Sequence, residues 1–189
     1  MQRRAFLKAA AVALPAVALE DALRTDACAQ VIVAAAAVDV HVVGAGEDRF
    51  GQPHPMGFSS LLFKVPGQET GGNLFILEHK NLMPGGPPLH QHWSQEEWFY
   101  VMEGDVVFQV GEKRVTLHAG ESVLAPRQVP HTFSGLGEKP GHMLIAFTPA
   151  GKMEAYFRDA KNPPAGVSPA EFFRRYEMDY VGPSPFAKS

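Results

Sequence analysis

The sequence predicts an all-β fold, a closed barrel or a two-sheet jelly roll, followed by short helices near the C-terminus. From residue 38 onward, apolar residues alternate or cluster over short runs that stop at Gly, Pro or Asn, which is the periodicity of strands rather than of helices. The 18 glycines and 16 prolines are scattered along the chain, as expected for many tight turns. Many short strands favour a barrel or jelly roll, because both arrangements dispose of exposed sheet edges.

The N-terminal segment 1–29 has the pattern of an export signal. A cationic start with Arg3, Arg4 and Lys8 precedes an apolar run over 9–19 that is too short to span a bilayer. The order Arg-Arg-Ala-Phe-Leu-Lys resembles the twin-arginine export motif. The segment therefore predicts a periplasmic or secreted protein, and a basic amphipathic helix that stays on the protein is the alternative.

The end of this signal can be placed in two ways. Ala27-Cys28-Ala29 fits a small-x-small cleavage site, which would make Gln30 the mature N-terminus. The alternative is a lipid anchor on Cys28. Because Cys28 is the only cysteine, cleavage after Ala29 would leave no disulfide, thiol nucleophile or zinc–thiolate site in the mature chain.

The composition excludes several classes of partner. The chain has 189 residues, 46% of them hydrophobic and 20% charged, as in ordinary globular domains. The formal net charge is -3 and the body of the chain has no basic run, so we expect no binding to nucleic acids or to anionic membranes. Because the apolar run over 9–19 is too short for a bilayer, we also expect no membrane span. A small molecule is the expected partner.

Residues 30–58 are expected to form an N-terminal extension with the first strands, residues 59–149 the barrel, and residues 150–189 C-terminal helices and a tail. Gly-Asp at 104–105 and Gly-Glu-Lys at 111–113 predict hairpin turns. The expected barrel strands cover 59–65, 74–81, 97–102, 106–110, 114–117, 122–125, 131–134 and 142–148.

The pattern becomes helical after residue 149. Met153, Tyr156 and Phe157 follow one another at helical intervals, and the segment SPAEFFRRYEMDY offers Ser168 as an N-cap with Glu171 at the capping-box position. We expect two short helices that pack on the outside of the sheets. Their aromatic side chains are expected to serve packing and to have no catalytic role.

Two histidines predict one half of a metal site. Residues two apart on a strand point to the same face, so His90 and His92 can present both imidazoles to one point. Neutral imidazole suits zinc, copper, iron and nickel, and an added carboxylate extends the range toward manganese. A mixed histidine–carboxylate transition-metal site is therefore expected.

Glu96 and Glu97 compete for the place of the carboxylate. An inward Glu97 puts Phe99 and Val101 on the same inner face, and Glu96 then faces solvent or the loop. A third histidine, His131, begins a later strand, which the closure of a small barrel can bring close. We therefore expect Glu97 and His131 to complete the site.

These residues resemble the two motifs of the cupin family. The first motif has an HxH pair, a glutamate and a glycine at this spacing, and the second has a glycine, a proline and a histidine. Gln128 stands where the second motif has glycine and Gly135 where it has asparagine, while Pro84 replaces the glycine before the HxH pair. The matching residues are His90, His92, Glu97 and Gly104 in the first motif and Gly120, Pro126 and His131 in the second.

The resemblance implies a double-stranded β-helix barrel that binds one divalent transition metal, Fe, Mn, Ni, Cu or Zn, through His90, His92, Glu97 and His131. The chain is similar to small single-domain cupins described as quercetin-dioxygenase-like, which implies a dioxygenase for a small aromatic, enolic or phenolic substrate, with dioxygen as co-substrate. In such an enzyme Glu97 would also serve as general base. The apolar pocket walls are expected to include Phe99, Val101, Phe108, Leu124 and Phe133.

Two other classes of function stay open. Cupins include non-catalytic members, so a metal- or ligand-binding protein of the cell envelope is one alternative, and an oxygen-independent isomerase or decarboxylase is another. The resemblance also implies pairing through outer strands and hence a homodimer. No role in the site is expected for His41, His54, His79, His118 and His142, although His54 and His79 precede or enter barrel strands.

Overall fold

The computed structural model describes residues 40–187. The expected export signal, its cleavage after Ala29 and the lipidation of Cys28 lie outside the described residues. The chain divides into a segment that ends at His41 and a compact unit that begins at Val42, and every described helix and strand belongs to this unit. No helix within the described range is long and apolar enough to cross a membrane.

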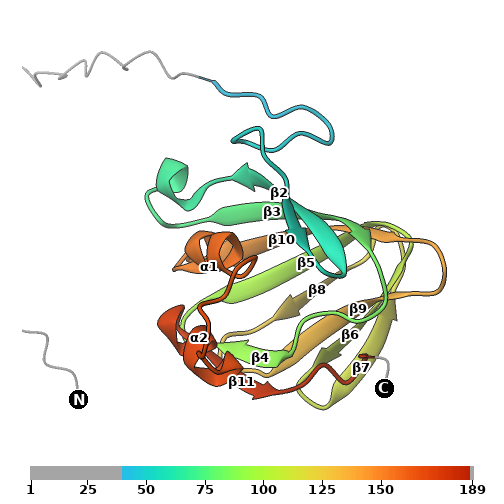
Figure 1. Ribbon diagram of the computed structural model, residues 1–189. Helices are drawn as coiled ribbons and strands as arrows, with labels where there is room; N and C mark the ends of the chain where they lie inside the picture. The colour runs from blue at the N-terminus through green and yellow to red at the C-terminus, as the bar shows by residue number, and fades with distance from the viewer. Residues whose placement is uncertain (1–39, 188–189) are drawn as a thin grey trace, which may run out of the picture. The chain divides into compact units, whose positions relative to one another are not determined.

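Two antiparallel sheets form the unit, as the sequence predicts (Figure 1). The six-stranded sheet has the order β1-β2-β3-β10-β5-β8, and the five-stranded sheet has the order β11-β4-β9-β6-β7. The strands are β1 (His54–Met56), β2 (Ser59–Val65), β3 (Phe75–Leu82), β4 (Leu89–His92), β5 (Glu96–Glu103), β6 (Asp105–Val110), β7 (Lys113–Leu117), β8 (Ser122–Ala125), β9 (His131–Leu136), β10 (Gly141–Thr148) and β11 (Met178–Gly182). A single-turn 3-10 helix, η1 (Gly67–Thr70), lies between β2 and β3.

The core lies between the two sheets. In β5 and β10 every second residue is buried, which is the alternation of strands with one face on the core. The ring of Phe99 in β5 lies 5.1 Å from that of Phe108 and 5.4 Å from that of Phe133, and both partners belong to the other sheet. These aromatic contacts join the two sheets next to the histidine strands.

One of the two expected hairpins is wrong. Gly111 lies in the turn between β6 and β7, which pair as an antiparallel hairpin. Gly104, by contrast, joins β5 to β6, and these strands belong to different sheets. Its φ of 72° supports a tight crossing from one sheet to the other, because glycine adopts left-handed conformations at low cost.

The C-terminal part contains two helices, α1 (Met153–Asp159) and α2 (Pro169–Arg175). The predicted capping box is present, since the Ser168 hydroxyl accepts from the Glu171 backbone N–H and the Glu171 side chain accepts from the Ser168 N–H. The α2 helix ends at Arg175, as a short helix should. Glu177 has a left-handed φ of 63°, and the chain then forms β11. Residues 150–189 therefore include a strand of the barrel as well as helices.

The sequence analysis expected the helices to pack on the outer faces of the sheets, and this expectation is wrong. They lie at one end of the two sheets (Figure 1). Phe157 of α1 reaches the core, with its ring 6.2 Å from that of Phe75 and 5.8 Å from that of Phe147. Burial of large aromatic rings stabilises this position, so α1 closes the end of the barrel rather than covering a sheet.

Candidate metal centre

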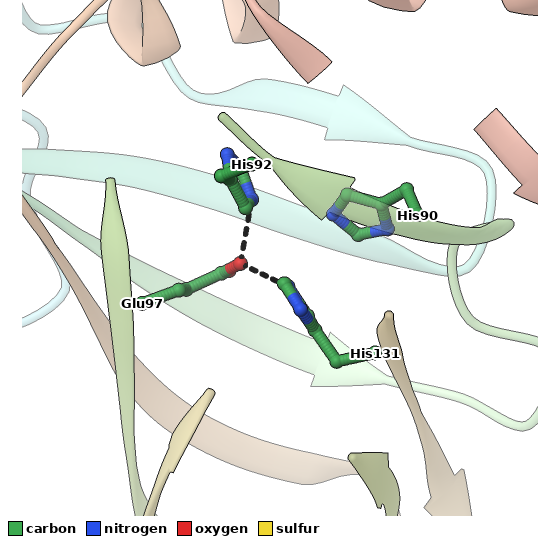
Figure 2. A group of neighbouring side chains, drawn as sticks. All are labelled: His90, His92, Glu97 and His131. Carbon is green, nitrogen blue, oxygen red and sulfur yellow. Dashed lines mark hydrogen bonds and ion pairs between the residues drawn. The ribbon is translucent and has the colours of Figure 1, made fainter. Parts of the chain in front are cut away.

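Three strands position the four residues of the predicted site. His90 in β4 and His131 in β9 are direct partners across an antiparallel pair, and His92 follows His90 by two residues on the same face. Glu97 enters from β5 in the opposite sheet. Figure 2 shows the four side chains converging from these strands. The register of two sheets therefore brings together residues that are far apart in the sequence.

The four side chains form one compact and buried cluster. Their candidate ligand atoms all lie within 4.8 Å of one another, and all four residues are buried. One carboxylate oxygen, Glu97 Oε2, lies 3.0 Å from His92 Nε2 and 2.8 Å from His131 Nε2 (Figure 2). The donor set is three imidazoles and one carboxylate, which suits first-row divalent metals.

Backbone carbonyls orient two of the imidazole rings. His90 Nδ1 lies 2.8 Å from Pro88 O, and His131 Nδ1 lies 2.9 Å from Val129 O. A carbonyl oxygen can only accept a hydrogen bond, so each Nδ1 carries the proton. Each Nε2 then faces the cluster, with its lone pair available whenever the ring is neutral. Such contacts fix the tautomer of metal-binding histidines.

The contact between His131 and Glu97 indicates that a cation belongs at this point. If the His131 ring were neutral, its Nε2 lone pair would face the Glu97 carboxylate at 2.8 Å without a proton between them. Two acceptors at hydrogen-bond distance repel each other, so either a second proton on the ring or a metal cation must lie in the cluster. The donor set and its orientation fit a divalent metal.

The titration behaviour of the cluster agrees with this fit. Burial first, and then the charges of His131 and His92, lower the pKa of His90 to about 3, so that its ring is neutral near pH 7. Burial opposes ionisation of Glu97, but hydrogen bonds and charge from His131 and His92 outweigh it and hold the pKa of the carboxyl well below its usual range. A neutral imidazole and an ionised carboxylate are the forms that bind metals.

Glu96 does not belong to the cluster. Its carboxylate accepts hydrogen bonds from the Arg127 backbone N–H at 2.8 Å and from Arg127 Nε at 2.6 Å. It thereby fastens the loop that precedes β9. Glu97 is thus the carboxylate that meets the histidines, and Glu96 supports the loop that leads to His131.

The departures from the cupin motifs leave the four residues in place. Gln128 adopts the left-handed φ of 62° that glycine favours, and its backbone N–H donates to His92 O at 2.8 Å. Gly135 is required by close approach, because a Cβ at this position would lie 2.4 Å from Leu82 O. The substituted positions therefore keep the loop and the strand crossing without asparagine or the usual glycine.

A cavity lies beside the cluster, with about 370 Å³ of empty space, part of it open to solvent. Of the expected wall residues, Phe133 lines it, whereas Phe99, Val101 and Phe108 are buried in the core without lining it. The expectation for Leu124 is wrong, because its side chain is 49% exposed on β8. The residues that line the cavity are Met56, Phe58, His79, Pro87, His90, Glu97, Phe133, Ile145, Met153, Tyr156 and Phe157.

Of the residues that line the cavity, the sequence analysis expected His90, Glu97 and Phe133, and two groups among the others are informative. Met153, Tyr156 and Phe157 come from α1, whose aromatic residues we expected to be packing alone, and their helical spacing gave no sign of a pocket. His79 comes from β3 and was expected to have no role. Its only signal was its place in an expected barrel strand, two residues after the apolar run Phe75-Ile76-Leu77.

Three further histidines lie outside the cluster and its cavity. His118 lies at the surface beside Asp105, and His142 pairs with Glu78 at 2.6 Å. His54 stacks on the ring of Phe63 at 4.2 Å. None of these three lines the cavity.

Comparisons with known proteins agree with this fold. The chain is similar to the solved structure of a predicted oxalate decarboxylase from Thermotoga maritima, with 19% identity, a TM-score of 0.53 and coverage of 58% of this chain and 99% of that one. It is also similar to an RmlC-like cupin from Shewanella frigidimarina, with 19% identity, a TM-score of 0.50 and coverage of 61% and 96%. At such identity the likeness concerns the fold alone.

A curated relative covers a smaller segment. An uncharacterized protein of Methanocaldococcus jannaschii is 26% identical over 61 residues, which are 32% of this chain and 49% of that protein, so the match spans about half the relative's length. Residues 79–147 match the family described as "Cupin domain", and this segment contains all four clustered residues. The cluster therefore lies within a segment that is similar to a cupin domain.

Proposed function

We propose that the protein is a mononuclear metal-dependent dioxygenase that acts on a small aromatic, enolic or phenolic substrate. The observation that supports this proposal most directly is the cluster itself: three imidazoles and one carboxylate, all buried, within 4.8 Å of one another and beside a cavity. Buried polar groups that converge on a mostly apolar cavity are the usual form of a small-molecule site.

His90, His92, Glu97 and His131 would hold one divalent transition metal, and the donor set accepts Fe, Mn, Ni, Cu or Zn. When bound, such an ion supplies Lewis acidity toward a substrate oxygen and, if it is redox-active, electrons for dioxygen. Four protein ligands would leave an octahedral ion two positions for small ligands.

The protein's own residues would handle a proton and exclude water. Glu97 Oε2 contacts the two histidines, whereas no described residue donates a hydrogen bond to Oε1. Oε1 is therefore the atom that could take the proton of a substrate hydroxyl. Phe133, Ile145 and Phe157 on the cavity walls would keep bulk water from the reacting groups.

The cavity limits the substrate to a small molecule. Its empty space of about 370 Å³ includes space that is open to solvent, so the enclosed part is smaller still. The mainly apolar and aromatic wall favours a flat ring or a compact enol. A fused polycyclic substrate such as a flavonol would require α1 to move.

Oxygen uptake tests the proposal. Protein reconstituted in turn with each of the five metals is incubated with a panel of phenols, catechols and β-diketones while dissolved oxygen and products are followed. We expect oxygen consumption coupled to loss of one substrate, and none with a His90→Ala, His131→Ala variant. Turnover without oxygen uptake would replace the dioxygenase with an isomerase or decarboxylase, and unchanged substrate with every metal would favour a binding protein.

The proposal also covers the subcellular location and the oligomeric state of the protein. We propose export by the twin-arginine route, from the pattern of residues 1–29, and a homodimer. Fractionation of cells that express the full chain, followed by sedimentation analysis of the purified protein, checks both. Retention in the cytoplasm or a monomer at micromolar concentration would contradict them.

A further inference from the structure

His79 is a buried polar side chain in the wall of the cavity. It belongs to β3, is 2% exposed and lines the same cavity as His90 and Glu97. Phe58 stacks on its ring at 6.4 Å and Phe133 meets it edge-on at 5.5 Å. Two aromatic neighbours that line the same cavity therefore hold the imidazole in one orientation.

The hydrogen bonding of His79 is half complete. Its Nδ1 lies 3.0 Å from Ser59 Oγ, and no described residue forms a hydrogen bond with Nε2. Nε2 is nevertheless not fully enclosed by protein atoms, so it faces open space rather than the packed core. Because His79 lines the cavity, a ligand in the cavity is the remaining partner for Nε2.

The imidazole is uncharged under ordinary conditions. Burial lowers the pKa of His79 to about 3, against a smaller opposing effect of the Glu97 carboxylate. A neutral ring has one donor and one acceptor nitrogen. If the Ser59 hydroxyl donates to Nδ1, the ring proton is on Nε2, which then offers a donor to the cavity.

We propose that His79 is a substrate-binding residue whose Nε2–H donates a hydrogen bond to one oxygen of the substrate, while a second oxygen of the same molecule binds at the metal centre. This inference rests on the proposed metal centre. The cavity wall also includes the apolar side chains of Met56, Ile145 and Phe157. The substrate class is therefore a small aromatic or enolic compound with two oxygen functions separated by an apolar body.

Ser59 is the positioning residue in this arrangement. When its hydroxyl donates to Nδ1, the ring proton is on Nε2, which is the tautomer that the proposal requires. Ser59 lies on β2 and His79 on β3, and these two strands pair directly. The sheet thus fixes the distance between the hydroxyl and the ring.

The first experiment compares ligands that differ by one oxygen. Zinc-loaded protein is titrated calorimetrically with hydroquinone, resorcinol and acetylacetone, which have two oxygens, and with phenol, which has one. We expect at least one two-oxygen ligand to bind more tightly than phenol, and His79→Phe to weaken that ligand by about 3- to 10-fold, the worth of one neutral hydrogen bond. Phenol should bind both proteins equally.

Matched variants control this result. His118→Phe changes an exposed histidine and should leave every affinity unchanged. The zinc content of each protein is measured first. Wild-type protein without zinc would overturn the metal centre and this inference together. Full zinc in wild type and His79→Phe, with equal affinity for the two-oxygen ligands, would overturn this inference alone.

Two other outcomes would also overturn it. Tyr156 lines the same cavity, so a loss of affinity in Tyr156→Phe but not in His79→Phe would assign the oxygen to the tyrosine. No binding of any ligand to zinc-loaded wild type at millimolar concentration would reject the substrate class.

A second measurement reads the tautomer directly. Histidine ring ¹⁵N spectra of the zinc-loaded protein should show the proton of His79 on Nε2, and this signal should shift when the two-oxygen ligand is added. Ser59→Ala should mix the two tautomers while zinc binding is unchanged, an effect that a purely structural serine would not produce. A proton on Nδ1 in the wild type would contradict the donor role.

Discussion

At the scale of single residues, burial and the neighbouring side chains have competing effects on the charge of the clustered groups. Burial disfavours charge on every member, yet Glu97 stays ionised because His92 and His131 face it. His90 stays neutral near pH 7 because burial, and after it the charges of His131 and His92, lower the pKa of its ring. His90 and Glu97 therefore hold the protonation states that a metal requires, and substitutions that keep the shape of the side chain test their roles.

Glu97→Gln is the most informative of these substitutions. It keeps the side-chain shape but removes the charge and the proton acceptor at Oε1. We expect the variant to retain some metal and to lose turnover by roughly 10²- to 10⁴-fold, the usual contribution of a general base. The measurement is metal content together with steady-state oxygen uptake.

Glu96→Gln is the matched control, because Glu96 is the neighbouring carboxylate and binds Arg127 rather than the cluster. It should keep both the metal and the activity. Full activity in Glu97→Gln would show that Glu97 is not the base.

His79 predicts a pH dependence of stability. The folded protein keeps the ring neutral down to about pH 3, whereas the unfolded chain binds a proton below about pH 6.5. Between these values the unfolded state holds more protons, so stability falls as the pH falls. The free energy of unfolding of wild type should decrease relative to His79→Phe by about 1.4 kcal/mol per pH unit within this window. Urea unfolding at several pH values measures the difference, and parallel curves would contradict it.

At the scale of elements, β4 carries two of the four residues and is held on both sides. It pairs with β9 through His90 and His131, and with β11 through His90 and His92, whose partners in the register are Tyr180 and Met178. The α2 helix leads into β11 and places the ring of Phe173 5.6 Å from that of His90. The short C-terminal elements thus position the histidine strand.

The N-cap of α2 gives a test at this scale. Ser168→Ala removes the side-chain acceptor for the Glu171 N–H and should lower the free energy of unfolding by about 1 kcal/mol. Ser168→Asp supplies another good cap and should restore most of it. Denaturant unfolding measures both, and equal stability of Ser168→Ala and wild type would show that α2 contributes little to the barrel.

The elements also show what the sequence could predict. Strand alternation placed His90 and His92 on one face and predicted Glu97 rather than Glu96 as the inward carboxylate, because alternation acts over short distances, whereas His131 was assigned from the resemblance to the second cupin motif. The expectation for Leu124 failed because the sequence of one strand does not determine its register with a strand far away in the chain. β8 pairs Ala125 with Glu97 and Leu124 with Trp98, so Leu124 takes the outer face. Likewise, β11 could not be expected, since a left-handed Glu177 ends the helix only where β4 offers an open edge.

At the scale of the whole molecule, the cluster joins the two sheets of the barrel. Three histidines come from the five-stranded sheet and Glu97 from the six-stranded one. The cavity beside the cluster uses both sheets and is closed by α1, which belongs to neither. A ligand-binding pocket built from three separate parts of the chain cannot be predicted from local periodicity. The position of the four metal-binding candidates follows from the two-sheet fold.

The metal centre is the central claim, and elemental analysis tests it most directly. The full chain is expressed with its own N-terminal segment, collected from the periplasm and analysed beside the His90→Ala, His131→Ala double variant and a folded His118→Ala control. We predict close to one transition-metal ion per chain in wild type and control, and none in the double variant. No metal in any of the three, even after anaerobic reconstitution, would contradict the claim.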